Sequence, residues 1–535
     1  MVRTTLPFAD TLQFSKLIAD YINGNDFLRS LSAFDLQMQS FDKAIAERKK
    51  FKVNRNLLAN ELLIQYQSTV FANELTEDDS VLKNLLLLRA ENTFTVTTGH
   101  QLNIFTGPLY FVYKILSAVK LCEELKKKYA DHNFVPVYWM ATEDHDYDEI
   151  KSVFVNGKNI VWDTNQSGAV GRFQTTTFKK ATEEFCDSIF DGTDAQLLKE
   201  MIRTAYLKNN NLANAMRSLV HSLMGRYGLV VMDADSAAFK KQAIDLFKQE
   251  LETEFSFHTH EQSTQKLADT YGLQVHPRDI NLFYLKDGLR ERIIKGKDGY
   301  QVHHADIHFT KEQLIKELET YPERFSPNVI LRPLYQETIL PNIAYVGGPA
   351  EVHYWLQLKN VFETAQVYYP MVLLRNCLLM VSKESRAVMQ KAGIEVVHIF
   401  KPADELLKAY VKASYRNELN MEQEQHHAKL LFEKIKQRVT AVDPTLERHA
   451  DAEAVKFFKR LKATEEKMLR AIKRKEDVQA TRIEKFKQQL FPGNGMQERK
   501  ENIFPYLSEH GLTLLDDLKN AMQPLAKEFL VLQFN

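Results

Sequence analysis

Five consecutive polar residues, Thr142–Asp146 (TEDHD), follow the apolar run VPVYWMA and form the densest cluster of acid–base groups in the chain. A histidine flanked by carboxylates is held in one tautomer and gains basicity, which suits a general base. We therefore expect His145 to be catalytic, together with Asp144, Asp146 and Glu143. The same carboxylates could bind Mg²⁺ carried by a nucleotide. A solvated acidic turn is the plain alternative.

A second polar cluster, Thr98–Gln101 (TGHQ), ends a short run of β-forming residues. A glycine-containing loop between a strand and a helix exposes backbone N–H groups, and the helix N-terminus adds the positive end of its dipole. We expect Thr98, Gly99 and Gln101 to contact substrate, and His100 to stabilise charge at the reacting centre. The loop matches neither GxGxxG nor a Walker sequence. An ordinary strand–helix turn with a surface histidine is the alternative.

Further candidates lie in two later segments. HPRDINLF contains Asn281, and LRPLYQETILPNIAYVGGPAEVHYW contains Arg332 and Glu351. Gly347 and Gly348, in the same segment, would let a ligand approach the backbone closely. We expect these five residues to bind substrate, although simple turns would account for the pattern equally well.

Two strands joined by one helix must position the first two clusters. Residues 93–98 alternate β-forming side chains, residues 134–140 form an apolar run, and residues 108–128 carry apolar side chains at helical spacing. If the strands are parallel, a right-handed crossover brings both strand ends to one edge of the sheet. Open α/β sheets bind ligands at that edge. The sequence therefore predicts an α/β fold with a parallel-sheet core and one crevice that both clusters face.

Composition sets limits on partners and location. The chain has 535 residues, 44% hydrophobic and 26% charged, which is typical of a soluble protein of several units. Lys+Arg and Asp+Glu are both 70, so bulk attraction to nucleic acid or anionic membranes is not expected. There is no signal-peptide core, no membrane-length apolar run, no metal-spaced cysteine pair and no helical HExxH sequence. We expect a cytoplasmic protein with no membrane, nucleic-acid or metal partner.

Changes in residue pattern divide the chain into four parts. The first insertion contains two strand-like pieces, VFVNGKNIVW and GAVGRFQTTTF, and the third part has 4-3-4-3 apolar spacing on both sides of Asp443-Pro444, typical of an antiparallel coiled coil. The predicted parts are a helical lead-in packed on the core (residues 1–92), the core with insertions at about 150–225 and 255–325 (93–384), the coiled coil (385–495), and a segment that returns to the core (496–535).

Five segments, in order, resemble the bacillithiol biosynthesis cysteine-adding enzyme family. They run from about Thr93 to Leu507 and read TGHQLNIFTGPLYFVYK, PVYWMATEDHDYDEI, HPRDINLFY, LRPLYQETILPNIAYVGGPAEVHYW and FPGNGMQERKENIFPYL. The resemblance implies a Rossmann-like core akin to class I aminoacyl-tRNA synthetases, with connecting insertions. It also implies a coiled-coil domain that serves homodimerisation. The family usually has glutamine where this chain has His100.

The resemblance further implies a carbon–nitrogen ligase that joins the carboxyl of L-cysteine to the amine of glucosaminyl malate, in the last step of bacillithiol biosynthesis. The malate carboxylates would need cationic partners, and we expect these to be Lys114, Arg332 and Arg375. His145 would take the proton of the attacking amine. No cofactor is fixed by the residues, and ATP or ADP with Mg²⁺ is the candidate.

Two other functions remain compatible with the residues. The basic stretch from Lys456 to Lys487 would suit a non-catalytic nucleotide- or nucleic-acid-binding adaptor whose working part is the coiled coil. The TEDHD cluster would suit a metal-dependent hydrolase.

Overall fold

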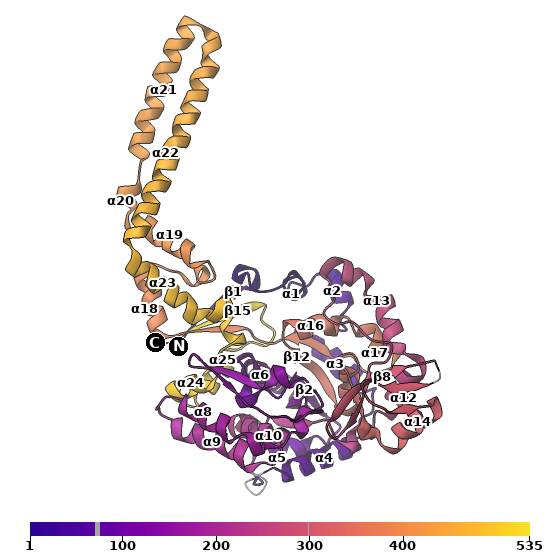
Figure 1. The fold of residues 1–535 in the computed structure, drawn as a ribbon. Helices are drawn as coiled ribbons and strands as arrows, with labels where there is room; N and C mark the ends of the chain where they lie inside the picture. The colour runs from indigo at the N-terminus through magenta and orange to yellow at the C-terminus, as the bar shows by residue number, and fades with distance from the viewer. Residues whose placement is uncertain (70–74, 298, 535) are drawn as a thin grey trace.

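The computed structural model describes residues 1–69, 75–297 and 299–534 and is built around a central sheet of five strands (Figure 1). All neighbouring strands are parallel, in the order β13-β12-β2-β3-β6. Their apolar side chains are buried on both faces, as is usual for parallel sheets. The strands are β2 (Thr93–His100), β3 (Asn133–Met140), β6 (Val230–Asp233), β12 (Asn342–Gly347) and β13 (Met371–Leu374).

The strand order reverses at β2. The chain first moves outward from β2 through the helix α6 (Tyr110–Lys128) to β3 and then to β6. It later returns to place β12 and β13 on the other side of β2. Ligands of doubly wound sheets bind at the carboxyl ends of the two strands where this reversal occurs. The predicted parallel Rossmann-like core is thus confirmed, and its reversal point lies between β2 and β12.

The first 92 residues are mostly helical, as predicted, but begin with a strand. That strand, β1 (Val2–Pro7), runs antiparallel to β15 (Glu528–Gln533), which in turn pairs in parallel with β14 (Leu378–Val381). The two ends of the chain therefore lie side by side in one small sheet. The helices are α1 (Lys16–Ile22), α2 (Asp26–Ser30), α3 (Ser40–Arg48), α4 (Arg55–Gln67) and α5 (Ser80–Leu87).

Between β3 and β6 the chain forms a hairpin and a group of helices. VFVNGKNIVW has the expected strand structure and forms the hairpin, but GAVGRFQTTTF does not form a strand. Its backbone instead bonds to the loop after β3: Val170 N–H donates to the Asp144 carbonyl (2.7 Å), and Gly171 N–H to the Thr142 carbonyl (2.8 Å). The elements are α7 (Tyr147–Ile150), β4 (Ser152–Val155), β5 (Lys158–Val161), α8 (Lys179–Asp187), α9 (Ala195–Lys208) and α10 (Leu212–Met224).

A second, mostly antiparallel group follows β6 and covers the carboxyl edge of the central sheet. Its five strands have the order β10-β9-β8-β7-β11. They are β7 (Leu282–Lys286), β8 (Leu289–Lys295), β9 (Tyr300–Val302), β10 (His308–Phe309) and β11 (Phe325–Pro327). Between β6 and β12 the chain also forms the helices α11 (Ala237–Lys241), α12 (Ile244–Thr253), α13 (Phe255–Tyr271), α14 (Lys311–Thr320) and α15 (Arg332–Ile339). The helices α16 (Pro349–Leu356) and α17 (Lys359–Thr364) lie between β12 and β13.

A long helical hairpin projects from the body of the molecule (Figure 1). Its two helices, α21 (Glu422–Val442) and α22 (Glu447–Lys475), fold back at Asp443-Pro444, as the spacing of apolar residues predicted. Phe432 of α21 packs on Phe457 of α22 with ring centroids 5.4 Å apart. The remaining helices are α18 (Lys383–Ala392), α19 (Ala403–Ser414), α20 (Arg416–Leu419), α23 (Asp477–Leu490), α24 (Phe504–His510) and α25 (Leu514–Ala521). Among the described residues, no helix is long and apolar enough to cross a membrane.

Candidate functional site

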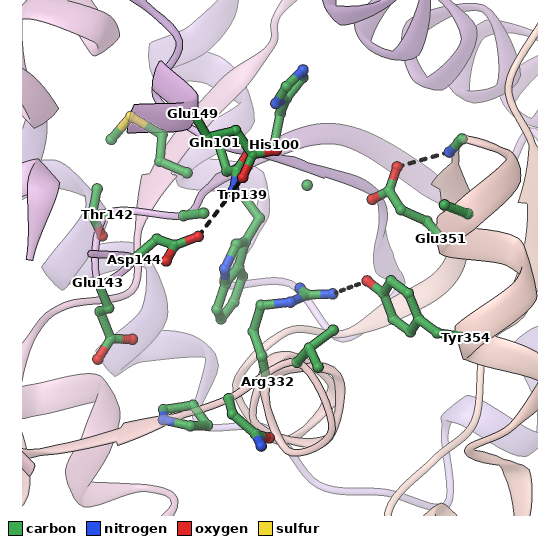
Figure 2. A pocket seen from close by; sticks show the side chains of 18 of the residues that line it. His100, Gln101, Trp139, Thr142, Glu143, Asp144, Glu149, Arg332, Glu351 and Tyr354 are labelled. Carbon is green, nitrogen blue, oxygen red and sulfur yellow. Dashed lines mark hydrogen bonds between the residues drawn. The ribbon is translucent and has the colours of Figure 1, made fainter. Parts of the chain in front are cut away.

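A cavity of about 980 Å³ opens at the reversal point of the sheet. Its lining comes from the loops after β2, β3 and β12 and from the segments around β7, β8 and β11. In Figure 2, Arg332, Tyr354 and Glu351 lie on one side, Thr142, Glu143 and Asp144 on the other, and Trp139 between them. The volume of the cavity is within the usual range for small-molecule sites.

The two sequence clusters meet in this cavity. The Gln101 amide donates to Asp144 Oδ2 (3.0 Å) and to Glu149 Oε2 (2.6 Å), so the loop after β2 is tied to the loop after β3 (Figure 2). These contacts exist because β2 and β3 are parallel and end at the same level, with His100 opposite Met140. The predicted single crevice is therefore present.

The wall nearest the sheet is built on a partly buried carboxylate, Glu351. It accepts hydrogen bonds from Lys114, from the Tyr345 hydroxyl (2.5 Å) and from the Gly348 N–H (2.8 Å). Burial alone would raise the pKa of Glu351, but Lys114 and these hydrogen bonds hold it below its ordinary value. Lys114 also donates to the Gly99 carbonyl. Its charge is therefore compensated within the wall, contrary to the expectation that Lys114 would bind a substrate carboxylate.

Arg332 is the cation that this wall presents to the cavity. Its Nη1 donates to Gln336 Oε1 (3.0 Å), its Nη2 donates to the Tyr354 hydroxyl (2.9 Å), and the guanidinium lies over the Tyr345 ring. No carboxylate within the described chain forms an ion pair with it. A guanidinium that is fixed by hydrogen bonds but has no carboxylate partner is suited to bind an anionic ligand.

Arg375 was predicted to bind substrate, but its charge is neutralised internally. Its Nη2 and Nη1 donate to the two carboxylate oxygens of Glu498, at 2.6 and 2.8 Å. Both side chains are almost fully buried. Arg375 lines the cavity, but its role there is to anchor the late segment around Glu498 against the end of β13.

On the opposite wall, Arg290 has more influence on the pKa of His145 than any carboxylate has. Arg290 Nη1 donates to His145 Nδ1 (2.7 Å) and lies 3.8 Å from Asp144 Oδ1. Burial and the Arg290 charge together lower the pKa of His145, and the nearby Asp144 only partly opposes them. The expected gain in basicity is therefore wrong. Arginine can only donate, so the neutral ring carries its proton on Nε2 and presents a donor to the cavity.

Asp144 remains an ionised carboxylate. Burial would raise its pKa, but Arg290, the Gln101 amide and the backbone N–H groups of His145 and Asp146 hold the pKa below its ordinary value. Glu143, its neighbour, is buried in an ion pair with Lys240, which also pairs with Asp235. Burial raises the pKa of Glu143 despite Lys240. Asp144 is thus an accessible, ionised carboxylate on this wall.

The comparison with known families fits this architecture over the whole chain. Residues 1–376 match the model described as "Bacillithiol biosynthesis BshC, N-terminal Rossmann-like domain". Residues 378–534 match "Bacillithiol biosynthesis BshC, C-terminal coiled-coil domain". The chain belongs to the BshC family. The resemblance inferred from the five segments is confirmed, and with it the expected enzyme class, a ligase.

Individual BshC relatives are similar along almost their entire length. A protein of Flavobacterium johnsoniae is 39% identical over 96% of this chain and 97% of its own. One of Christiangramia forsetii is 36% identical over 100% of this chain and 99% of its own. One of Chlorobaculum tepidum is 29% identical over 96% of each. All three carry the provisional name cysteine ligase BshC.

Four of the predicted residues do not line the BshC cavity. Thr98 is buried and donates to the Val346 carbonyl (2.7 Å). Asp146 caps α7 by accepting from the Glu149 N–H. Asn281 is fully buried and bonds to Glu250 and Ser256, so it supports the wall from behind. The fourth is Gly347, the last residue of β12.

His100 does reach the cavity but is held as a neutral ring. It stacks on Tyr110 with centroids 5.2 Å apart and planes 7° apart. Burial, with Lys114 and Arg375 nearby, lowers its pKa well below the ordinary value. Its Nε2 is buried and has no hydrogen-bond partner among the described residues. The ring therefore supplies shape and a polar edge rather than positive charge.

Sequence reasoning missed several cavity arginines. Arg278, Arg292 and Arg499 line it, and no ion pair joins any of them to another residue of the described chain. Arg290 and Arg292 have the two-residue spacing of one strand face, which is the signal that could have found them. Arg499 lies in the segment Phe491–Leu507, which supported the family resemblance without an assigned role.

The Gly99 position tests how closely this wall is packed. A methyl group there would lie 2.9 Å from the Tyr345 hydroxyl oxygen and 3.7 Å from Arg332 Nη1. We expect Gly99→Ala to displace Tyr345 and to destabilise the fold by about 1–3 kcal/mol, the usual cost of overpacking. Thermal unfolding would measure this, with Gly495→Ala, whose new methyl group meets no atom closer than 3.9 Å, as the control. Equal melting temperatures would contradict the tight packing.

Proposed function

We propose that this chain joins the carboxyl group of L-cysteine to the amine of glucosaminyl malate, the step that completes bacillithiol. One observation carries this proposal beyond the family name: the cavity holds arginines whose charge no carboxylate of the described chain neutralises. They are Arg278, Arg292, Arg332 and Arg499. The two malate carboxylates are the kind of group that such arginines bind.

Arg332 and Arg499 are the proposed partners of the malate. Both belong to the sheet side of the cavity: Arg332 contacts Tyr345 and Tyr354, and Arg499 acts on the pKa of Tyr110 in the same wall. Two separated guanidinium groups can each hold one carboxylate. The sugar amine would then extend toward Asp144 on the opposite wall.

Asp144 is the proposed proton acceptor. The amine nitrogen attacks the acyl carbon of activated cysteine, the new C–N bond forms, and the bond from that carbon to its leaving group breaks. The leaving group takes the bonding electrons, and the ammonium proton passes to the Asp144 carboxylate. His145, with its proton on Nε2, donates a hydrogen bond to the acyl oxygen as charge develops there.

Activation of the cysteine carboxyl requires a co-reactant, which we propose to be ATP. A free carboxylate is a poor acyl donor because its leaving group would be oxide, whereas a phosphoryl or adenylyl ester leaves readily. Arg278, which precedes β7, and Arg292, in β8, are the unpaired cations available to a phosphate group. Mg²⁺ would enter with the nucleotide.

We also propose that two chains pair through the helical hairpin. Leu431 and Val455, each 56% exposed, and Leu430 and Phe457 offer apolar surface on its two helices. Burying such side chains against a second copy would remove them from water. The cytoplasmic location stays a prediction.

Product formation tests the proposed reaction. The purified protein is incubated with L-cysteine, glucosaminyl malate and ATP, and mass spectrometry follows a product with the summed mass of the two substrates minus water. We expect that product, together with ADP or AMP in equal amount. Absence of product, with no binding of glucosaminyl malate, would reject the proposal.

Variants of His145 distinguish a hydrogen-bond donor to the acyl oxygen from a general base. Glutamine places an amide N–H close to where His145 Nε2 lies, so we expect His145→Gln to retain most of the turnover. His145→Ala should lose about tenfold, the worth of one hydrogen bond to a charged oxygen. Steady-state kcat at saturating substrates measures both. Equal losses of more than about 100-fold in the two variants would instead identify His145 as a base.

A further inference from the structure

A chain of buried hydrogen bonds leads from Arg332 to a carboxylate behind the cavity. Arg332 Nη1 donates to Gln336 Oε1 (3.0 Å), and Gln336 Nε2 donates to Glu337 Oε1 (2.8 Å). Asn342 Nδ2 donates to the same Glu337 oxygen (2.8 Å). Gln336, Glu337 and Asn342 are at most 1% exposed. Water therefore does not supply alternative partners for these groups.

The direction of every bond in this chain is determined. Asn342 Oδ1 accepts from the hydroxyls of Thr95 (3.2 Å) and Thr97 (2.8 Å), so the amide nitrogen of Asn342 must face Glu337. Arg332 can only donate, so the Gln336 oxygen must face the guanidinium and the Gln336 nitrogen must face Glu337. Both amide nitrogens thus need an acceptor at the position of Glu337 Oε1.

We propose that Glu337 is a positioning residue for substrate binding: by accepting from Gln336, it holds the Gln336 carbonyl against Arg332 and fixes the guanidinium toward the cavity. The inference rests on the proposed function in taking Arg332 as a contact of the anionic substrate. Glu337 itself does not line the cavity. Its effect reaches the substrate through two side chains of one helix, α15, in which Arg332 and Gln336 are one turn apart.

The charge of Glu337 depends on pH near neutrality. Burial raises its pKa to about 7, although Arg48 of α3 and the hydrogen bonds from Asn342 and Gln336 oppose the rise. Arg332 on α15 and Tyr368 are the other titratable or charged groups that act on it. Above pH 7 the ionised carboxylate only accepts. Below pH 7 the carboxyl is neutral, so the hydrogen bond that Glu337 Oε1 accepts from Gln336 loses its charge assistance and holds the amide less firmly.

The same shift sets the effect of Glu337 on stability. Its pKa in the folded chain is above the ordinary value of 4.5. Its stabilising effect is therefore fully present below pH 4.5 and is lost as the pH rises through about 7. A glutamine at this position cannot ionise and avoids that loss. At pH 8 we expect Glu337→Gln to be at least as stable as the wild type.

Kinetics with glucosaminyl malate test the proposal. Glu337→Gln keeps an oxygen that can accept from Gln336 but removes the negative charge, so we expect its KM at pH 8 to rise about tenfold, the worth of one charge-assisted hydrogen bond, with kcat little changed. The wild-type KM should rise as the pH falls through 7, whereas the variant KM should not follow that change. Gln336→Met removes the hydrogen bonds between Arg332 and Glu337 but keeps Glu337 itself. Its KM at pH 8 should be raised as much as that of Glu337→Gln, and it replaces that variant if Glu337→Gln fails to fold.

The control is Glu317→Gln, because Glu317 accepts from Tyr284 and Arg324 outside the cavity. We expect its KM to match the wild type. A Glu337→Gln KM within twofold of the wild type at pH 8 would overturn the proposal.

Crystal structures make the test independent of the reaction. At pH 8, Arg332 Nη1 should contact Gln336 Oε1 in the wild type and should be displaced in Glu337→Gln and in Gln336→Met. An unmoved guanidinium in both variants would overturn the inference even if the ligase reaction is observed. Conversely, a displaced guanidinium in a protein that does not bind glucosaminyl malate would support the positioning role and reject the proposed function.

Discussion

Asp144→Asn is expected to lower kcat by about 10²- to 10⁴-fold, the range of a lost general base. The asparagine keeps the size of the side chain and can still accept from Gln101, but it cannot take the amine proton. KM for glucosaminyl malate should change much less, because Arg332 and Arg499 remain. Steady-state kinetics at saturating cysteine and ATP measure the two constants separately.

The control for Asp144 is Asp148→Asn. Asp148 is an exposed carboxylate of α7, the helix that follows the loop of Asp144; it pairs with Lys151 and does not line the cavity. Its turnover should equal that of the wild type. A second check is pH: because the pKa of Asp144 is held below its ordinary value, kcat should stay level down to acid pH and fall only there. Turnover of Asp144→Asn within threefold of the wild type would remove Asp144 as the proton acceptor.

Arg375→Ala is expected to destabilise the fold by about 3–5 kcal/mol, because it leaves Glu498 buried without its partner. Both members of the pair are at most 2% exposed, so solvent cannot compensate the carboxylate. Urea unfolding followed by the fluorescence of Trp139 and Trp355, which are both buried, measures the loss.

A double variant separates the lost charge from lost packing. Arg375→Met with Glu498→Gln removes both charges while keeping most of the side-chain volume, and it should recover much of the stability. If Arg375→Ala unfolds at the wild-type urea concentration, the pair is not a structural anchor. Arg375 would then be free to bind substrate, as the sequence first suggested.

The sequence predicted the elements of the site well because they are local. TGHQ and TEDHD each follow a short β-forming run, and a single helix lies between them. A parallel pair with a right-handed crossover was therefore enough to place Gln101 beside Asp144. The helical hairpin was equally predictable, since its apolar spacing and the Asp443-Pro444 turn are both read directly from neighbouring residues.

What could not be predicted is how distant charges neutralise one another. Lys114 and Arg375 looked like substrate cations, but their carboxylate partners, Glu351 and Glu498, lie 237 and 123 residues further along the chain. His145 looked like a base because of its sequence neighbours. Yet Arg290, 145 residues away, determines which ring nitrogen of His145 carries the proton. Only the fold shows which of the candidate cations remain unpaired.

The central claim is that unpaired arginines bind the malate carboxylates of the substrate. Calorimetric titration of the wild type and of Arg332→Ala, with glucosaminyl malate and with the methyl glycoside of glucosamine, tests it most directly. We predict that the wild type binds glucosaminyl malate at least about 100-fold more tightly than the glycoside, and that Arg332→Ala loses most of this difference. Equal affinity of the wild type for the two ligands would contradict the account.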